Sequence, residues 1–528
     1  MSTAPSPRTD WLLLDRLART VCEVDPRPHS PFAVAVVLEV LGHTDRTAQD
    51  SGWPDLFVLA ADVYERVEFV AASHRRGTAR EERDEDDPPL LRDSLASGAA
   101  QQAAWLVMVV VTLAWGVSVW ASERLSPLYG EALLAGIVGS LILSGGFQYA
   151  VTRRLLFHVA QRDLVQARAY LRRVFAVGGL AVAAASALVG AALWAVHRGS
   201  LAGPLLASGY FLLHGNYRIA SVPLQALHDV PGIVVSTAGA LGLLLLAYRG
   251  LVAAGAEVSV AVAVAQLLAL LGLWVGCGIR GLSILASAGR SDPDSPAPPR
   301  PGLSPRGQVL LREAAPWFAL GVLYYLFFFA TRPVAWALPL GERLRYEWGM
   351  DLGLLAIIPS ALGASWLLRR FTRELRERMR ETSLVHVGAF RREVAVSFGR
   401  RVGEARLWGA SWALLLLVLV HAGAPFLGVP GALRDVLRLA VGGTAFLLPP
   451  FALAFGLLVS LGILGDALGV VGAGLVLHGG LGLAVTRFGS APLLVAAFLA
   501  SAAAMGELAV WRAQRAVRRI DRHYYALF

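Results

Sequence analysis

Residues 258–279 read VSVAVAVAQLLALLGLWVGCGI, contain no charged side chain, and are followed directly by Arg280. A helix of about 20 apolar residues matches the hydrocarbon thickness of a bilayer. Runs of this kind follow one another from about residue 100 to the end of the chain. The whole sequence is 56% hydrophobic and only 16% charged, with a mean hydropathy of +0.56, which is far more apolar than a soluble domain. The sequence therefore predicts an all-α, polytopic membrane protein.

We expect twelve membrane spans in two groups of six. They cover about residues 103–121, 131–151, 174–196, 204–226, 232–252, 258–279, 315–338, 350–368, 407–427, 437–464, 467–486 and 490–511. A Pro-rich interruption near residues 288–307 divides the two groups. We therefore expect a cytoplasmic region at residues 1–90, six-helix bundles at 92–286 and 311–528, and a linker at 287–310. Two matched bundles are typical of secondary transporters.

The arginines predict the orientation of the chain. All 48 basic residues are Arg; residues 1–99 hold 18 acidic and 11 basic side chains, so the remainder carries +17. Dense arginine clusters follow even-numbered spans, at 153–173, 280–312, 369–406 and 512–522. The positive-inside rule then places both termini in the cytoplasm of a bacterium, with the chain in its inner membrane. The arginines lie in short loops between apolar runs, where membrane orientation explains the basic pI better than nucleic-acid binding does. We therefore expect no nucleic-acid partner.

The first 90 residues differ in kind from the rest. Apolar stripes at helical spacing run through residues 11–21 and 57–69, and Ser30-Pro31 is a typical helix start before the apolar run that stops at Gly42. We expect three amphipathic helices, then a charged, solvated linker from Arg75 to Pro89. Residues 1–10 lack the apolar core of a cleavable signal peptide.

Few polar side chains lie inside the predicted spans, and charges there are expensive and usually functional. Our candidates for a substrate cavity are six residues of spans 4 and 7: His214, Asn216, Tyr217, Arg218, Thr331 and Arg332. The two arginines would attract an anionic or heavily hydroxylated substrate. The alternative is that Arg218 reaches the interface from a helix end and Arg332 marks a turn at Pro333.

The long basic loop after span 8 has apolar residues Phe371, Leu375 and Met379 four apart. This spacing predicts a helix on the bilayer surface whose arginines bind anionic lipid. The predicted contacts are Arg369, Arg370, Arg373 and Arg376. A solvated linker is the alternative.

Motifs for catalysis are missing from the sequence. We find no phosphate-binding Gly-Lys-Ser loop, no paired His spacing for a metal and no nucleophile elbow. Cys22 and Cys277 lie in different regions and are expected to be free thiols. We therefore expect no enzyme activity, no cofactor and no metal, and transport not driven by ATP bound to this chain.

Short motifs stand at 315–332, 346–347, 351–359, 147–154, 217–230 and 524–528. Together they resemble the PelG-like family of Pel exopolysaccharide transporters. The resemblance implies the fold of the MOP (multidrug/oligosaccharidyl-lipid/polysaccharide) flippase superfamily: two six-helix bundles around a central cavity, working by alternating access on a polymer or lipid-linked sugar. That family has an Asp-Lys pair where this chain has Thr331-Arg332, so the acid is lost and the cation kept. Residues 1–90 lie outside the family pattern.

Three functions fit these observations. The first is export or flipping of a polysaccharide or lipid-linked glycan, with a glycosyltransferase or polysaccharide-synthase complex as partner. The second is efflux of small molecules by the same fold. The third is a membrane scaffold that transports nothing and recruits a glycan synthase.

Overall fold

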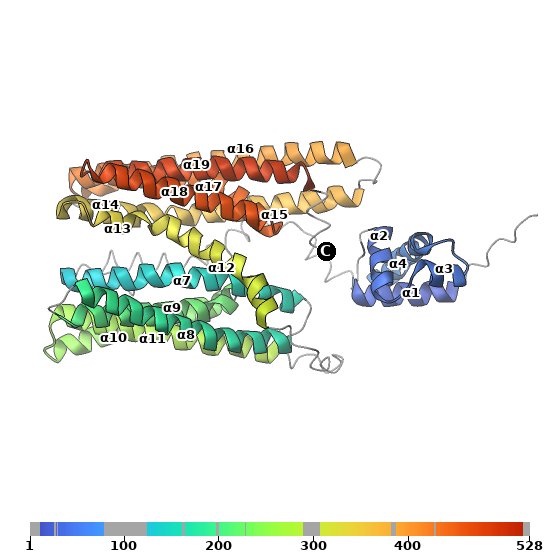
Figure 1. The fold of residues 1–528 in the computed structure, drawn as a ribbon, viewed down its shortest axis with the longest axis horizontal. Helices are drawn as coiled ribbons and strands as arrows, with labels where there is room; N and C mark the ends of the chain where they lie inside the picture. Colours follow the sequence, from blue (N-terminus) through green and yellow to red (C-terminus); the bar gives the residue numbers. More distant parts are fainter. Residues whose placement is uncertain are drawn as a thin grey trace, which may run out of the picture. The chain divides into compact units, whose positions relative to one another are not determined.

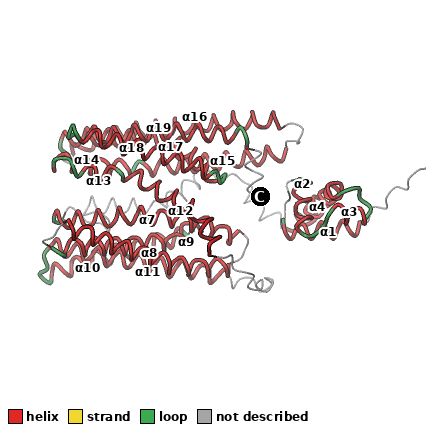
Figure 2. Tube along the Cα trace, in the orientation of Figure 1, coloured by secondary structure: helices red, strands yellow, loops and turns green. Residues whose placement is uncertain are grey.

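The structure is a computed structural model. It describes residues 11–25, 28, 30–78, 124–160, 164–196, 200–227, 229–288, 307–381, 387–426 and 429–520. The first predicted span and nearly all of the Pro-rich interruption lie outside these residues. The chain divides into two compact units: residues 1–90 with 373–390, and the remainder. Throughout the described ranges the regular structure is helical (Figure 2).

The described part of the amino-terminal unit contains four helices. They are α1 (Trp11–Val24), α2 (Pro31–Val40), α3 (Asp45–Asp50) and α4 (Leu56–Thr78). The Ser30 hydroxyl accepts a hydrogen bond of 3.2 Å from the Ala33 amide, so the predicted helix start is confirmed. Apolar residues of α1, α2 and α4 form one buried core. Two details of the prediction were wrong: α3 was missed, and α4 continues past Arg75 to Thr78.

The apolar part of the chain forms long helices grouped into two bundles (Figure 1). The first bundle contains α7 (Pro127–Ala160), α8 (Leu164–Val196), α9 (Ala202–Ala226), α10 (Val230–Ala253) and α11 (Val258–Ala288). The second contains α12 (Gly307–Phe329), α13 (Thr331–Ala335), α14 (Leu340–Leu354), α15 (Ile357–Glu381), α16 (Val387–Phe426), α17 (Gly431–Ser460), α18 (Leu464–Thr486) and α19 (Ala491–Val517). Every predicted span within the described ranges therefore falls on helix. Ten of the stretches that the structure describes are long and apolar enough to cross a membrane.

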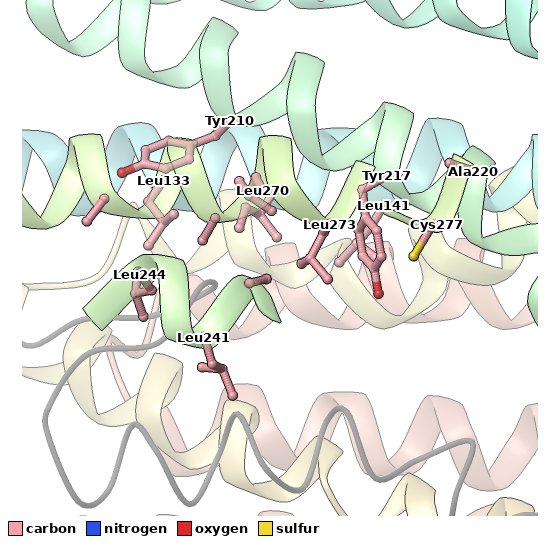
Figure 3. Close-up of a cluster of buried hydrophobic side chains, with 14 of the residues drawn as sticks. Leu133, Leu141, Tyr210, Tyr217, Ala220, Leu241, Leu244, Leu270, Leu273 and Cys277 are labelled. Atoms are coloured by element: carbon pink, nitrogen blue, oxygen red, sulfur yellow. The ribbon is translucent and has the colours of Figure 1, made fainter. Parts of the chain in front are cut away.

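Helix α9 is too polar to be among those ten, yet it is the inner helix of the first bundle. It contacts α7, α8 and α11, and every residue from His214 to Leu224 is buried. A run of eleven buried residues covers all sides of a helix, since one turn takes 3.6 residues. Polar groups on α9 therefore meet protein instead of lipid, which makes them tolerable at this depth. On its apolar side, Tyr210 and Tyr217 join Leu270, Leu273 and Cys277 in a buried cluster (Figure 3).

Two spans of the second bundle are broken. The predicted span 315–338 is α12 and the short α13, separated by a turn at Ala330. The helix that carries the predicted span 350–368 begins ten residues before it, at Leu340, and turns at Leu355–Ala356 before continuing as α15. Pro333 and Pro359 lie just after the two turns, and proline removes a backbone donor that a continuous helix needs.

Helix α15 runs without interruption from its apolar part into the basic stretch. Phe371 and Leu375 are buried, and the Phe371 ring lies 5.3 Å from that of Phe398 on α16. The expectation that this apolar stripe faces lipid was therefore wrong, because it packs against α16. Arg369, Arg370 and Arg376 are exposed and Arg373 is half-buried; their contact with lipid remains a prediction. The side chain of Met379 lies outside the described residues.

Candidate functional site

Arg218 connects the two bundles. It lies in the interior of α9, eight residues before the last residue of the helix, and only 9% of it is exposed. Its Nη2 donates to Gln148 Oε1 on α7 and to the Tyr325 hydroxyl on α12, both at 2.6 Å. Tyr325 belongs to the second bundle. The alternative explanation, an arginine reaching the interface from a helix end, is thus wrong for Arg218.

A short chain of amides and hydroxyls extends from this contact. The Tyr325 hydroxyl also donates to Gln148 Oε1 at 3.3 Å, and Gln148 Nε2 donates to Gln225 Oε1 on α9 at 2.6 Å. Gln225 in turn donates to Ser221 at 3.2 Å. We call Arg218, Gln148, Tyr325 and Gln225 the seam cluster.

Within the described ranges, the seam cluster leaves a buried positive charge without a counter-ion. Among the described residues no carboxylate forms an ion pair with Arg218, and its buried Nε has no hydrogen-bond partner there. A guanidinium presents five donors in a fixed fork, and a carboxylate or phosphate engages two of them at once. The cluster therefore has unused capacity to bind an anion or a hydroxyl-rich group.

The helices cross closely beside the cluster. A Cβ placed on Gly321 of α12 would lie 2.2 Å from the carbonyl oxygen of Gly145 and 2.9 Å from the Cα of Gly146, both on α7. Only glycine allows backbones to approach this closely, as in other membrane helix pairs. We call this crossing the seam; Figure 1 shows α7 beside α12.

The other predicted residues of α9 act within the first bundle. His214 shares a 2.7 Å hydrogen bond with Ser140 on α7. Asn216 donates to the Leu212 carbonyl oxygen at 2.8 Å, and Tyr217 belongs to the apolar cluster of Figure 3. In the described structure His214 and Tyr217 contact other helices of the first bundle and Asn216 bonds within α9, whereas Arg218 reaches across the seam.

Thr331 and Arg332 form a second, separate cluster. Arg332 is buried and forms an ion pair with Asp351 of α14, and Thr331 hydrogen-bonds to the Tyr346 hydroxyl. Arg332 follows Tyr325 by seven residues, or about 10 Å of helix. The sequence predicted one cavity lined by both arginines, and the structure places them in two clusters. The acid missing beside Arg332 in the sequence is supplied by α14.

Further ion pairs join the bundles near both ends of α7. Close to its start, Glu131 accepts a 3.1 Å bond from Arg343 of α14, which also donates to Glu347 at 3.0 Å. Close to its end, Arg154 donates to Glu313 of α12 at 3.0 Å, and Arg153 stacks on Trp317. The two bundles are thus linked at both ends of α7 and at the seam between them.

Several of these residues were missed as site candidates. Gln148 and Asp351 stand in the motifs quoted for the family resemblance, and Tyr325 in an aromatic run, but nothing in the linear sequence pairs them with Arg218 or Arg332. In the ranges that the structure covers, no three His, Cys, Asp or Glu residues gather as a metal site.

No protein-family model matches the chain, and no curated protein matches its sequence. Solved structures do match it. An outward-facing multidrug resistance MATE transporter of the MOP superfamily aligns with a TM-score of 0.57 and 13% identity, over 83% of this chain and 99% of that one. The MATE transporter ClbM in complex with Rb⁺ aligns with a TM-score of 0.53 and 13% identity, over 84% of this chain and 97% of that one.

This chain has the MOP transporter fold. The predicted fold class is confirmed. The part of the chain that this alignment leaves out is about as long as residues 1–90. A further match is a MOP superfamily transporter from Pyrococcus furiosus, which is described as having a binding pocket of reverse polarity. It aligns with a TM-score of 0.55 and 11% identity, over 82% of this chain and 98% of that one. At these identities the likeness shows the fold alone, so the cargo must be inferred from this chain's own residues.

Proposed function

We propose that this chain is a transporter that moves a polysaccharide or lipid-linked glycan across the bacterial inner membrane by alternating access. The observation that carries this proposal is Arg218, a buried cation to which the described residues offer no carboxylate partner, between two bundles that must move against each other. Glycans and their lipid carriers present hydroxyl, carboxylate and phosphate groups. Guanidinium, amide and phenol groups bind these through directional hydrogen bonds.

The arginine distribution gives this transporter a direction. If the basic segments face the cytoplasm, Glu131–Arg343 lies on the outer side, and we call it the outer pair. Arg154–Glu313 then lies on the cytoplasmic side, and we call it the inner pair. Alternating access requires one pair to open while the other stays closed. The seam between them would act as the pivot.

The proposal is tested by glycan secretion in a strain that lacks the gene. Wild-type chain should restore secretion, and Arg218→Ala should reduce it at least tenfold, because a hydrogen bond to a charged group contributes about 1.5–3 kcal/mol. Arg218→Lys should give an intermediate rate, since it keeps the charge and loses the fork. Arg487→Ala, an exposed arginine at the end of α18, is the matched control and should secrete normally. Unchanged secretion in the deletion strain would remove the proposal.

A small-molecule efflux carrier is the second candidate. It is favoured by an aromatic cluster near the seam, where the half-buried Tyr324 ring stacks at 5.5 Å on Phe455 and at 6.4 Å on Phe451. Aromatic rings of this kind stack on flat apolar compounds when the bundles open. This function predicts drug sensitivity on deletion without a defect in secreted glycan.

The synthase partner and the scaffold hypothesis share one test. Suppose that a glycosyltransferase co-purifies with the chain, and that Arg218→Ala impairs secretion while the glycosyltransferase stays bound. The chain then transports cargo within a synthase complex. If secretion needs the chain but tolerates Arg218→Ala and loss of either ion pair, the chain recruits the synthase and transports nothing.

A further inference from the structure

An open groove lies between α16 and α17, near the end of the first helix and the start of the second. Its volume is about 460 Å³, within the range of sites that bind small ligands. One face of α16 supplies most of the lining, and α17 supplies one side chain: Leu417, Val418, His421, Ala422 and Arg438. None of these residues belongs to the seam cluster, so the proposed transport path does not account for the groove.

The polar side of the groove lies at a membrane surface. Arg438 is the second residue of the predicted span 437–464, and Arg434 and Asp435 precede that span. Charged side chains at the end of a span reach the level of the lipid headgroups, because their apolar stems lie along the helix and their charged ends stay in the interface. Arg438 therefore stands where lipid phosphates are found.

The apolar side of the groove faces acyl chains. Residues 407–426 of α16 contain no Asp, Glu or Arg, and at 1.5 Å per residue this run matches the hydrocarbon thickness. Four of its apolar side chains are exposed in the described structure: Leu414, Leu415, Val418 and Leu419. An acyl chain from the surrounding bilayer can therefore reach the groove.

His421 and Arg438 present hydrogen-bond donors to the groove. Arg438 Nη2 donates to His421 Nδ1 at 2.8 Å. Arginine has no acceptor, so Nδ1 accepts and the imidazole proton lies on Nε2, where it is a further donor. Arg438 Nη1 donates to Asp435 Oδ1 at 3.2 Å. These bonds engage two of the five guanidinium N–H groups, so Arg438 retains donors for a ligand.

A second arginine stands beside this group. Arg434 and Arg438 are four residues apart on α17 and share one face of the helix. The Arg434 side chain forms no hydrogen bond or ion pair with any described residue, and its Nε is buried. Asp435 pairs with Arg438, so the three side chains carry a net charge of +1. An anion at this point would meet an unpaired guanidinium.

An apolar wall beside unpaired cations fits an amphiphile with an anionic head. A soluble anion would use the arginines and leave the wall of Leu417 and Val418 unused. A second copy of the chain, joined at this groove by a two-fold axis, would bring each arginine toward its own copy, and like charges oppose such a contact. A lipid with a net negative head satisfies both sides at once.

We propose that the groove between α16 and α17 binds an anionic phospholipid of the surrounding membrane. Its phosphate accepts hydrogen bonds from Arg434, Arg438 and His421 Nε2, and one acyl chain lies along Leu417 and Val418. A zwitterionic phospholipid has the same phosphate and chains, but its head adds a cation that the arginines repel. The site therefore prefers anionic lipid, whatever cargo the chain transports.

The site is tested by native mass spectrometry of the full chain in detergent, titrated with phosphatidylglycerol or with phosphatidylcholine of the same acyl chains. Wild type should bind one phosphatidylglycerol at least about fivefold more tightly than phosphatidylcholine. Arg434→Ala/Arg438→Ala should lose this preference. Arg249→Ala/Arg487→Ala removes two exposed arginines at the ends of α10 and α18 and should keep it. No preference in wild type, or equal loss in both double variants, would overturn the proposal.

Two single variants separate the groove from its charge. Ala422→Trp fills the groove at an exposed position, keeps both arginines, and should lower phosphatidylglycerol affinity to that of phosphatidylcholine. Asp435→Asn removes the competing acid and should tighten phosphatidylglycerol binding about fivefold, a gain that misfolding does not produce. Unchanged affinity in either variant would contradict the site.

The same spectra distinguish the other occupants. Millimolar glycerol 3-phosphate should leave the bound phosphatidylglycerol in place, and its displacement would assign the groove to a soluble anion. Wild type should bind the lipid as a monomer. A dimer that Ala422→Trp dissociates, without a preference for phosphatidylglycerol, would assign the groove to a second copy and overturn the lipid site.

Discussion

Arg218 is held by neutral groups alone in the described structure, and this arrangement has an energetic cost. A charge near the centre of a membrane helix costs about 2.5–3.5 kcal/mol on insertion scales. Gln148 and Tyr325 offset part of that cost, and the burial of α9 keeps lipid away. An anionic or hydroxyl-rich cargo would supply the missing partner. Arg332, by contrast, already has Asp351, so the two arginines of the sequence prediction have different roles.

At the residue scale, the amino-terminal unit also offers a pH-dependent contact. Asp15 of α1 forms an ion pair with Arg66 of α4, and this hydrogen bond holds the pKa of the Asp15 carboxyl below its usual value. A carboxyl whose folded pKa is lowered stabilises the fold above its unfolded pKa, and this contribution is lost as pH falls through the folded value.

We therefore expect the contact between α1 and α4 to weaken below about pH 4. Hydrogen exchange of the α1 amides in the full chain should accelerate as pH falls through this range, after correction for intrinsic exchange rates. Asp15→Asn should exchange faster than wild type at neutral pH and show no further acceleration. An identical pH profile in the variant and wild type would show that Asp15 does not contribute.

The identities of the polar residues were readable from the sequence, but their partners were not. Arg218 and Arg332 stand out because charges are rare in apolar runs. Gln148, Gln225 and Tyr325 stand out less, since they carry no charge and cost less than arginine in an apolar span. Their meeting depends on how α7, α9 and α12 pack, which local sequence does not specify.

At the scale of elements, the seam depends on three glycines. Gly321→Ala would place a methyl group against the backbone of Gly145 and Gly146, and the obstructing atoms are backbone atoms that cannot rotate away. We expect α7 and α12 to separate and glycan secretion to fall at least tenfold, with the chain still in the membrane. Gly239→Ala on α10, where a Cβ meets nothing within 4 Å, is the control. Normal secretion by Gly321→Ala would mean that the seam is not needed for transport.

The elements themselves were largely predictable from hydropathy, because any apolar run of bilayer length must satisfy its backbone within a helix. A turn at Pro333 was the alternative interpretation of Arg332, but the positions of the two breaks, at Ala330 and Leu355–Ala356, were not predicted. Pro333 and Pro359 signalled them, but proline also occurs inside continuous helices of this chain, such as Pro223 in α9. Whether a proline breaks a helix depends on what the neighbours offer the freed backbone groups. The basic stretch after span 8 was misjudged because apolar residues four apart fit a protein neighbour as well as a lipid surface.

At the scale of the whole molecule, the described conformation has both ends of α7 tied to the second bundle. Transport by alternating access requires the outer and inner pairs to break in turn. Each pair contributes little by itself because its members are partly exposed. Yet about 1.4 kcal/mol shifts a population tenfold, so removing one charge is enough to favour opening at that end.

The most direct test of this account measures both ends in one chain by double electron–electron resonance, after Cys22 and Cys277 have been replaced by Ser. Labels at Gly130 and Gly341, where a Cβ meets nothing within 4 Å, report the outer pair. Labels at Leu156 and Arg312, both exposed, report the inner pair. We predict that Glu131→Gln lengthens the outer distance and not the inner one, and that Glu313→Gln does the reverse. Both distances unchanged in both variants, or both lengthening together in either one, would contradict alternating access around the seam.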